Sequence, residues 1–301
     1  MKLNLDALFS QSHIRCRDRE ALEKKLAAVV EDGPRELLII SDFDQTLSRA
    51  YDEEGKPCTS SIGVFRLHGD KIQPGMAKEM QELFEKYYPT ECNPHLTMEQ
   101  KLPTIKEWWE KAHEVVTRVP FTAERLQQLV LESNLRLRDG AEEWLKNLEG
   151  HGIAILVFSA GIGDVIEIYL KHQLGEIPNH LHVIGNFLEY NAEGSVTTFQ
   201  EPTIHVFNKN ATVIKKNGPF WDAHSERKHI LLMGDSLGDL HMDVGEVHSG
   251  QTIKIGFLNT YSDDMLAKFM DGFDIVVIRD QTVDVPKFIT ELIANRGRAM
   301  E

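Results

Sequence analysis

Residues 37–46 read LLIISDFDQT, and the fold is decided where this apolar run meets its acidic residues. The run Leu37–Ile40 is short and unbroken, which is typical of a strand that is buried on both faces of a sheet. Asp42 and Asp44 follow at the carboxyl end of the expected strand. Ligands of open parallel sheets bind at that edge, so these two acids are the first candidates for a functional site.

The same pattern recurs along the chain in runs that predict four further strands: Ile153–Phe158, His229–Met233, Thr252–Ile255 and Asp274–Ile278. Helical patterns alternate with most of these runs: Arg17–Val30, Gly163–Leu174, Asp263–Met270 and Val285–Ala294. Such alternation predicts an α/β fold, a Rossmann-like doubly wound parallel sheet with helices on both faces. We assign this core to residues 1–51 and 139–301.

The intervening segment, residues 52–138, has no such apolar run and is rich in helix formers. Three helices are expected in it: Pro74–Tyr88, Thr97 to about Val116, and Thr122 to about Ser133. The first carries its proline in the first turn, where a missing amide is tolerated. The second opens with the spacing of a capping box. We therefore expect residues 52–138 to form a small helical-bundle cap domain at the edge of the sheet.

The composition excludes several classes of partner. The 301 residues carry a net charge of -14 without a cluster of Lys and Arg, whereas a protein that binds a nucleic-acid polymer needs a basic face. No stretch reaches the roughly 20 apolar residues of a membrane span, and the first residues do not resemble a signal peptide. Cys16, Cys58 and Cys92 have no paired spacing, which favours reduced thiols. We expect a cytoplasmic protein and, as the default for this size, a monomer.

Asp42 and Asp44 suit phosphoryl transfer. The oxygens of a phosphate monoester repel hydroxide, but a fixed carboxylate can attack phosphorus when a cation neutralises those oxygens and an acid protonates the leaving group. Asp42 is the candidate nucleophile, Asp44 the candidate acid and later base, and Thr46 the support of their loop. The alternative is that the two acids only cap a turn, which explains one acid better than two.

Three further segments supply partners for this chemistry. Ser159 follows a predicted strand and precedes a helix, so its hydroxyl and the nearby amides suit an anion, although a serine there is commonly a helix N-cap. Lys209 by itself would be an ordinary surface lysine, and only the other segments make it a candidate cation. Asp235 and Asp239 follow the strand at 229–233, one helical turn apart, as ligands of Mg²⁺ would be placed. The preference of helix N-termini for acids explains either one, but less well both.

Together these segments resemble the four motifs of the haloacid-dehalogenase-like phosphatase superfamily, and the resemblance narrows to the cytosolic 5'-nucleotidase III family. Four strings carry it: DFDQTLSR (42–49), FSAGIGD (158–164), HVFNK (205–209) and KIGFLN (254–259). It covers nearly the whole chain, with a poor match at Ala50–Asp70. The resemblance implies Mg²⁺ and an aspartyl-phosphate on Asp42, with Asp44 as acid and base. It also implies phosphate binding by Ser159, Ala160, Gly161 and Lys209. Mg²⁺ would be held by Asp42, Asp44 and Asp235, with Asp239 supporting the metal site.

The choice of nucleoside is expected in the cap, where Glu91 and Trp109 stand out. Trp108 is expected to pack in the cap core, and Trp109 points about 100° away from it around the helix. Trp109 and Ala112 resemble the branch of the family that is specific for 7-methylguanosine phosphate, whereas members acting on pyrimidines carry Tyr and Ser. The methylated purine is positively charged, so stacking on Trp109 adds a cation–π contact of about 0.5–2 kcal/mol. Glu91 can accept charge-assisted hydrogen bonds from the polar edge of the base.

The sequence therefore predicts a Mg²⁺-dependent 5'-nucleotidase that hydrolyses 7-methylguanosine 5'-monophosphate, and CMP as well. One alternative is a pyrimidine 5'-nucleotidase that acts mainly on CMP and UMP, with nucleoside phosphotransferase activity as a further outcome of the same intermediate. A phosphatase of small metabolites would have no use for Glu91 together with Trp109. A binding protein that has lost catalysis would have lost a motif, and all four are intact.

Overall fold

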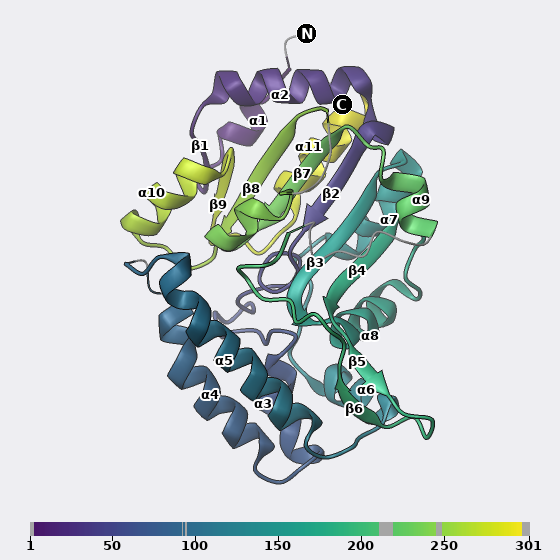
Figure 1. Ribbon diagram of the computed structural model, residues 1–301. Coiled ribbons are helices and arrows are strands. Elements are labelled where there is room, and N and C mark those ends of the chain that lie inside the picture. The colour runs from purple at the N-terminus through teal and green to yellow at the C-terminus, as the bar shows by residue number, and fades with distance from the viewer. Residues whose placement is uncertain (1–2, 92, 94, 211–218, 245–248, 297–301) are drawn as a thin grey trace.

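The computed structural model describes the chain except for residues 1–2, 92, 94, 211–218, 245–248 and 297–301. Its main sheet has seven strands in the order β1-β9-β8-β7-β2-β3-β4 (Figure 1). These are β1 (Ile14–Cys16), β2 (Leu37–Ser41), β3 (Ala154–Ile162), β4 (Leu181–Asn186), β7 (His229–Gly234), β8 (Thr252–Leu258) and β9 (Ile275–Ile278). Neighbouring strands are parallel, except that β1 is antiparallel to β9. The predicted α/β fold with a mostly parallel sheet is confirmed.

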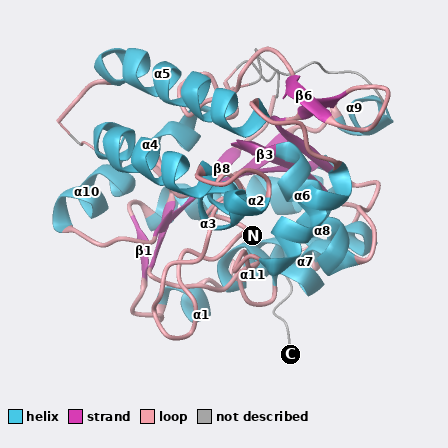
Figure 2. Cartoon of the chain, turned by 90° about the horizontal axis from the view of Figure 1, so that it is seen from below, coloured by secondary structure: helices cyan, strands magenta, loops and turns pink. Residues whose placement is uncertain are grey.

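Helices cover both faces of this sheet (Figure 2). They are α1 (Asp6–Phe9), α2 (Arg19–Asp32), α7 (Ala141–His151), α8 (Gly163–Leu174), α9 (Pro219–His224), α10 (Asp263–Gly272) and α11 (Asp284–Ala294). Short 3-10 helices add η1 (Pro34–Glu36) and η4 (Leu237–His241). A third, η2 (Gly69–Lys71), lies in the helical segment between β2 and α7. The sheet is thus the middle layer of three.

Alternate residues of each strand point to opposite faces, and the two hydrophobic clusters formed by the described residues divide accordingly. Leu37 and Ile39 of β2 belong to the cluster covered by α2, α7, α8 and α11. Leu38 and Ile40 belong to the cluster covered by α9 and α10. All four side chains are at most 5% exposed. Burial on both faces explains why the strand is continuously apolar in sequence.

The chain between β2 and α7 is helical. It forms α3 (Gly63–His68), α4 (Met76–Glu91), α5 (Met98–Thr117) and α6 (Ala123–Glu132). Helices α4 and α5 lie side by side and extend away from the sheet (Figure 1). The predicted capping box at Thr97 and Gln100 is present, and Thr122 accepts a hydrogen bond from the amide of Arg125 at the start of α6.

The predicted start of the expected helix Pro74–Tyr88, which corresponds to α4, is wrong. Helix α4 begins at Met76, so Pro74 lies before the helix and not in its first turn. Gly75 between them has a φ of 91°, which a right-handed helix does not contain. The side chain of Asp70 accepts a hydrogen bond from the Gly75 amide at 3.0 Å. An aspartate and a glycine therefore form the entry that the proline was expected to form.

A two-stranded antiparallel ribbon, which no sequence pattern predicts, is formed by β5 (Leu188–Tyr190) and β6 (Val196–Phe199). The ribbon packs against α5. The amide of Val196 donates to the carbonyl of Phe121 at 2.8 Å. A segment from the carboxyl-terminal half of the chain therefore adds to the helical part of the molecule.

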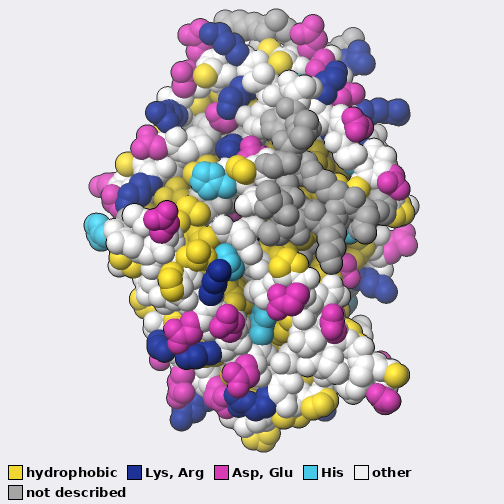
Figure 3. Space-filling model, viewed as in Figure 1, with side chains coloured by type: hydrophobic (Ala, Val, Ile, Leu, Met, Phe, Trp, Pro, Cys, Tyr) yellow, Lys and Arg dark blue, Asp and Glu magenta, His cyan; other side chains and the backbone are white. Residues whose placement is uncertain are grey.

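The described cysteines form no disulfide, and charged side chains of both signs lie on the face of the molecule drawn in Figure 3. Cys16 and Cys58 are free, and Cys92 lies outside the described residues. On the face drawn in Figure 3, Lys and Arg side chains are interspersed with Asp and Glu. Within the described ranges, no helix combines the length and the apolar character needed to cross a membrane.

Candidate active site

Asp42 lies at the carboxyl end of β2, between β3 and β7 in the middle of the sheet. Its amide donates to the carbonyl of Met233 at 2.9 Å, which continues the pairing of β2 with β7 by one residue. The residue is 6% exposed. Burial raises the pKa of Asp42 to about 7, with Lys209 acting against this rise and the charges of Asp239 and Asp44 adding to it. The sheet thus places one carboxyl group in a dry position at its ligand-binding edge.

Lys209 is buried beside Asp42 and is not a surface lysine, since it is 3% exposed. Its ammonium donates to Asp42 Oδ1 and also to Asp239 Oδ1, the latter at 2.7 Å. Burial by itself would lower the pKa of Lys209, but the two carboxylates raise it above its ordinary value. The structure therefore brings a fixed cation and two of the predicted acids into direct contact.

The loop that carries Lys209 is held by Asn186 at the end of β4. The Asn186 side chain donates to the carbonyl of Ile204 at 2.8 Å and accepts from the Ile204 amide at 2.8 Å. It also donates to the carbonyl of Ala160 at 2.6 Å. One buried asparagine therefore ties the lysine loop to the segment predicted to bind phosphate. This role of Asn186 is not predicted from the sequence, because a bridge between distant segments leaves no local pattern.

Three carboxylates gather at this edge of the sheet. Asp42, Asp235 and Asp239 each offer an oxygen atom, and these atoms lie within 4.8 Å of one another. Burial raises the pKa of Asp235 well above its ordinary value, and the charges of Asp42 and Asp239 raise it further. A cation would relieve this repulsion, and carboxylate oxygens are the ligands that hard divalent cations prefer. The donor set fits Mg²⁺.

The carboxylate of Asp44 lies outside this group and is bonded to Ser61. Asp44 Oδ1 accepts from the Ser61 amide at 2.7 Å, and Asp44 Oδ2 accepts from the Ser61 hydroxyl at 2.5 Å. Burial raises the pKa of Asp44, and the two hydrogen bonds from Ser61 act against this rise. Among the described side chains, Asp239 therefore lies beside Asp42 and Asp235, whereas the Asp44 carboxylate faces Ser61.

Residues 159–161, Ser-Ala-Gly, belong to the last part of β3, whereas the sequence places Ser159 after the strand. The pairing of β3 with β4 is irregular at this point, which lets the backbone turn before it leaves the sheet. Ser159 Oγ accepts from the amide of Gly161 at 2.9 Å. Helix α8 begins at Gly163 without a side-chain cap, so the alternative that Ser159 caps this helix is wrong.

The loop after Asp42 is held by Arg138, which the sequence analysis misses. Arg138 is 1% exposed, and it donates to the carbonyl of Thr46 at 2.7 Å and to that of Gln45 at 2.6 Å. It also donates to the side chain of Asn259 at 2.8 Å. Thr46 is buried, and its hydroxyl makes no hydrogen bond in the described part of the structure. Thr46 therefore contributes to this loop through its carbonyl, which accepts a hydrogen bond from Arg138.

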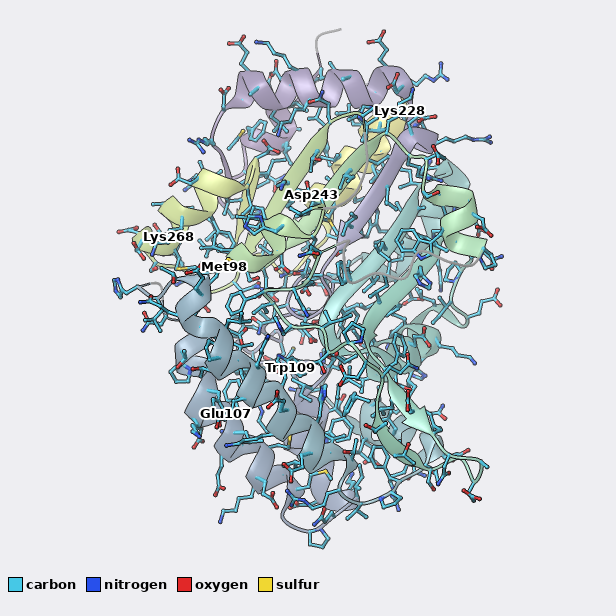
Figure 4. All side chains as sticks on the ribbon, viewed as in Figure 1. Met98, Glu107, Trp109, Lys228, Asp243 and Lys268 are labelled. Atoms are coloured by element: carbon cyan, nitrogen blue, oxygen red, sulfur yellow. The ribbon has the colours of Figure 1, made fainter. Side chains whose placement is uncertain are left out.

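The two neighbouring tryptophans of α5 pack in different places. Trp108 lies among the aromatic rings of α4, with its ring centroid 6.2 Å from that of Tyr87, which confirms its predicted packing. Trp109 is half-buried and packs at the margin of the hydrophobic cluster that contains Leu38 and Ile40 of β2. In Figure 4 it lies on the side of α5 that faces the strands. Glu107, which accepts a hydrogen bond from Tyr87 at 2.7 Å, faces α4 instead.

Glu91 is the last residue of α4. Its carbonyl accepts a hydrogen bond from Lys101 at 2.7 Å. Burial raises the pKa of the Glu91 carboxyl to about 7, Lys101 acts against this rise, and the charge of Asp239 adds to it. The effect of Asp239 means that Glu91 lies within electrostatic reach of this one carboxylate of the group.

Proteins of known activity resemble this chain over most of its length. The model of the pyrimidine 5'-nucleotidase (UMPH-1) family matches residues 45–294. A 7-methylguanosine phosphate-specific 5'-nucleotidase of Drosophila melanogaster is 36% identical over 289 residues, which are 96% of this chain and 90% of that protein. The protein of the same name from Homo sapiens is 36% identical over 282 residues, 93% of this chain and 92% of that one.

Solved structures show the same relationship. The crystal structure of cytosolic 5'-nucleotidase IIIB bound to cytidine has a TM-score of 0.88 and 35% identity, and 98% of each chain is covered. A substrate-bound phosphoserine phosphatase has a TM-score of 0.51 and 19% identity, covering 83% of this chain and 97% of that one. The second likeness concerns the fold alone.

Proposed function

This chain belongs to the pyrimidine 5'-nucleotidase (UMPH-1) family, and we propose that it hydrolyses 7-methylguanosine 5'-monophosphate, the substrate in the names of its relatives, and CMP as well, to nucleoside and phosphate. It is a 5'-nucleotidase and hence a phosphoric monoester hydrolase, like its named relatives. The base that it prefers and the steps of the reaction are proposals, which the arrangement of the site supports as follows.

The observation that carries the chemistry is the buried contact of Lys209 with Asp42 and Asp239. In the first step, an oxygen of Asp42 attacks phosphorus, the bond from phosphorus to O5' breaks, and Asp44 gives its proton to O5' of the leaving nucleoside. Lys209 would neutralise the charge on the phosphate oxygens. The raised pKa of Asp44 favours the protonated form that this step needs.

In the second step, water attacks the phosphorus of the aspartyl-phosphate, and Asp44 takes a proton from this water. The bond from phosphorus to Asp42 then breaks, so that Asp42 and Asp44 return to their starting states. One water is consumed for each nucleoside and phosphate released. If another nucleoside takes the place of water, the same intermediate gives phosphotransfer.

We propose that Asp42 and Asp235 hold Mg²⁺ with their carboxylates. Asp239 already uses its oxygens in hydrogen bonds to Lys209 and Ser236, which makes it a support of the site. Because the Asp44 carboxylate is bonded to Ser61, the donor that Asp44 has left to offer a metal is its main-chain carbonyl. When bound, the ion would neutralise the oxygens of the transferring phosphoryl group.

We propose that the phosphate is held by Lys209 and by residues 159–161. The hydroxyl of Ser159 and the main chain of Ala160 and Gly161 lie at the end of β3, beside the end of β2. The tie from Asn186 to Ala160 keeps this segment next to the lysine loop. A cation with hydroxyl and amide donors is a suitable set of partners for a phosphate dianion.

We propose that Trp109 stacks on the base and that Glu91 accepts hydrogen bonds from its edge. The half-buried ring of Trp109 faces the sheet and not the aromatic cluster of Trp108. Glu91 is half-buried, and the charge of Asp239 acts on the pKa of its carboxyl group. Both residues belong to residues 52–138, which we propose as the specificity cap on a catalytic core of residues 1–51 and 139–301, in a cytoplasmic monomer.

The second candidate function is hydrolysis of CMP and UMP as the main substrates. Two observations favour it: the name of the family, and the cytidine in the similar solved structure. Trp109 argues for the methylated purine, because its charge makes stacking on a tryptophan more favourable than stacking of a neutral base.

The experiment measures phosphate release with Mg²⁺ from 7-methylguanosine monophosphate, CMP, UMP, GMP and AMP, for the parent and for Trp109→Tyr. We expect 7-methylguanosine monophosphate to have the highest kcat/KM and GMP, which lacks the charge, to be nearly inert. Trp109→Tyr should lower the ratio of 7-methylguanosine monophosphate to CMP. If CMP and UMP have the highest kcat/KM in the parent, the pyrimidine function replaces the proposed one.

A further inference from the structure

We propose that Ser61 is a positioning residue of the reaction, which fixes the carboxyl group of Asp44 against the segment at 159–162. This inference rests on the proposed role of Asp44 as acid and base. Ser61 lies just before α3, where the chain enters its helical part, and it is 0% exposed.

Ser61 holds both oxygens of the Asp44 carboxyl group. Its amide donates to Oδ1 at 2.7 Å and its hydroxyl donates to Oδ2 at 2.5 Å. The carboxyl group therefore cannot rotate about its bond to Cβ without losing a hydrogen bond. A group that exchanges a proton with a bound leaving group has to keep one orientation, and Ser61 provides it.

The same hydroxyl contacts the end of β3. The amide of Ile162 donates to Ser61 Oγ at 3.3 Å. Gly161 packs so closely against the pair that a Cβ at this position would lie 1.9 Å from Ser61 Oγ and 2.8 Å from Asp44 Oδ2. The proposed acid and the proposed phosphate segment therefore meet at one hydroxyl group, and Ser61 sets the distance between them.

The backbone near Ser61 is itself held by Asn134, which lies on the segment that leads from α6 back to the sheet. The amide of Thr59 donates to the side chain of Asn134 at 3.1 Å, and Asn134 in turn donates to the carbonyl of Pro57 at 3.1 Å. The segment that leads from β2 into the helices is thus joined to the segment that leads back to the sheet, two residues from Ser61. This contact fixes the backbone that presents the Ser61 hydroxyl to Asp44.

The substrate p-nitrophenyl phosphate separates the two steps in which Asp44 would act. Release of p-nitrophenol needs little help from an acid, because p-nitrophenol is a far better leaving group than a nucleoside. Release of phosphate from Asp42 still needs a base for the attacking water. Both rates are measured in single turnovers, with Mg²⁺ and enzyme in excess. The matched control for Ser61→Ala is Ser60→Ala, whose hydroxyl accepts from the Gly63 amide at 3.2 Å.

We expect Ser61→Ala to release p-nitrophenol at a rate within about threefold of the parent. It should release phosphate about 10- to 100-fold more slowly than the parent, because it loses part of the rate enhancement that a positioned base contributes. Ser60→Ala should release both products at rates close to those of the parent. Equal slowing of both steps by Ser61→Ala, or slowing of neither, overturns the proposal.

Thermal unfolding is measured in parallel. If Ser61→Ala unfolds at a lower temperature than Ser60→Ala, the substitution is also made in the Asp44→Asn protein, to separate a loss of stability from a loss of positioning. There Ser61→Ala causes no further loss of phosphate release if it acts through Asp44, whereas a further loss by the same factor overturns the inference. None of these measurements uses a nucleotide. A parent protein that fails on nucleoside monophosphates therefore contradicts the proposed function and not the role of Ser61.

Discussion

Lys209 and Asp239 are joined by a buried hydrogen bond of 2.7 Å between the ammonium and Oδ1. The same ammonium donates to Asp42, and the side chain of Lys209 is only 2% exposed. One cation thus offsets two carboxylates that lie together with the carboxylate of Asp235. The charge balance of the site depends on this lysine, as does the proposed binding of phosphate.

Lys209→Met keeps the length of the side chain and removes its charge. Two buried carboxylates then lose their partner, so we expect the free energy of unfolding without metal to fall by about 3–5 kcal/mol. Phosphate release should fall as well. Urea unfolding and kcat/KM check this, with Lys268→Met as a control, because Lys268 pairs with the exposed Asp264 at 2.9 Å. Equal stability of the two variants would contradict the account.

Gly161→Ala tests how tightly the site is packed. The added Cβ would lie 1.9 Å from Ser61 Oγ, so the neighbouring groups must move. We expect the free energy of unfolding to fall by about 1–3 kcal/mol, as in other overpacked sites, and kcat to fall with it. Gly150→Ala is the control, because nothing lies within 4 Å of its Cβ. In helix α7 this change should stabilise by up to about 1 kcal/mol. A neutral Gly161→Ala would show that the contact is absent.

Arg138→Met tests the support of the nucleophile loop. Burial lowers the pKa of Arg138 to about 10, while Asp235 and Asp280 act against this shift, so the side chain remains charged at neutral pH. Its removal leaves the carbonyls of Gln45 and Thr46 without this donor, and we expect a loss of about 1–3 kcal/mol in unfolding free energy for each buried acceptor that stays unpaired.

The control for this change is Arg136→Met, two residues earlier in the chain. Arg136 is half exposed and pairs with Glu53 at 3.1 Å on the surface. Exposed pairs contribute little to stability, so its unfolding temperature should stay near that of the parent. If Arg138→Met is equally stable in thermal unfolding, the guanidinium does not hold the loop.

The pKa of Glu91, raised to about 7 chiefly by burial, predicts a pH dependence of substrate binding. Below this pH the carboxyl group is protonated and accepts fewer hydrogen bonds from the base. Above it the carboxylate is charged, so KM for 7-methylguanosine monophosphate should fall as pH rises from about 6 to about 8. Glu91→Gln resembles the protonated form at every pH and serves as the control, because titration of the substrate affects both proteins alike. A KM ratio between the two proteins that does not change with pH would refute this prediction.

Much of the core could be predicted from sequence because its central strands are buried on both faces. A run such as that of β2 must then be apolar at each position, and this leaves a strong pattern. Strand β4 lies at the edge of the sheet, and its residues alternate between buried and half-buried, so its pattern is weaker. The pair β5 and β6 is shorter still and packs on α5, a contact that no local pattern encodes.

The site divides in the same way. Asp42 and Asp235 directly follow buried strands, so their position at the sheet edge is predictable from the strands alone. Ser61 and Arg138 reach the site through contacts that span 17 residues to Asp44 and 92 residues to Thr46. Serine and arginine at such positions look like surface residues in the sequence. Only the folded chain identifies them as supports of the reacting groups.

The most direct test of the account compares phosphate release from 7-methylguanosine 5'-monophosphate by the parent and by Asp42→Asn, with Mg²⁺ and with a chelator. Asparagine has nearly the same size as aspartate but lacks the nucleophilic carboxylate. We predict that the parent with Mg²⁺ releases phosphate and that Asp42→Asn, or removal of the metal, slows this by at least about 1,000-fold. A variant as active as the parent, or a parent that releases no phosphate from any nucleoside monophosphate, would contradict the account.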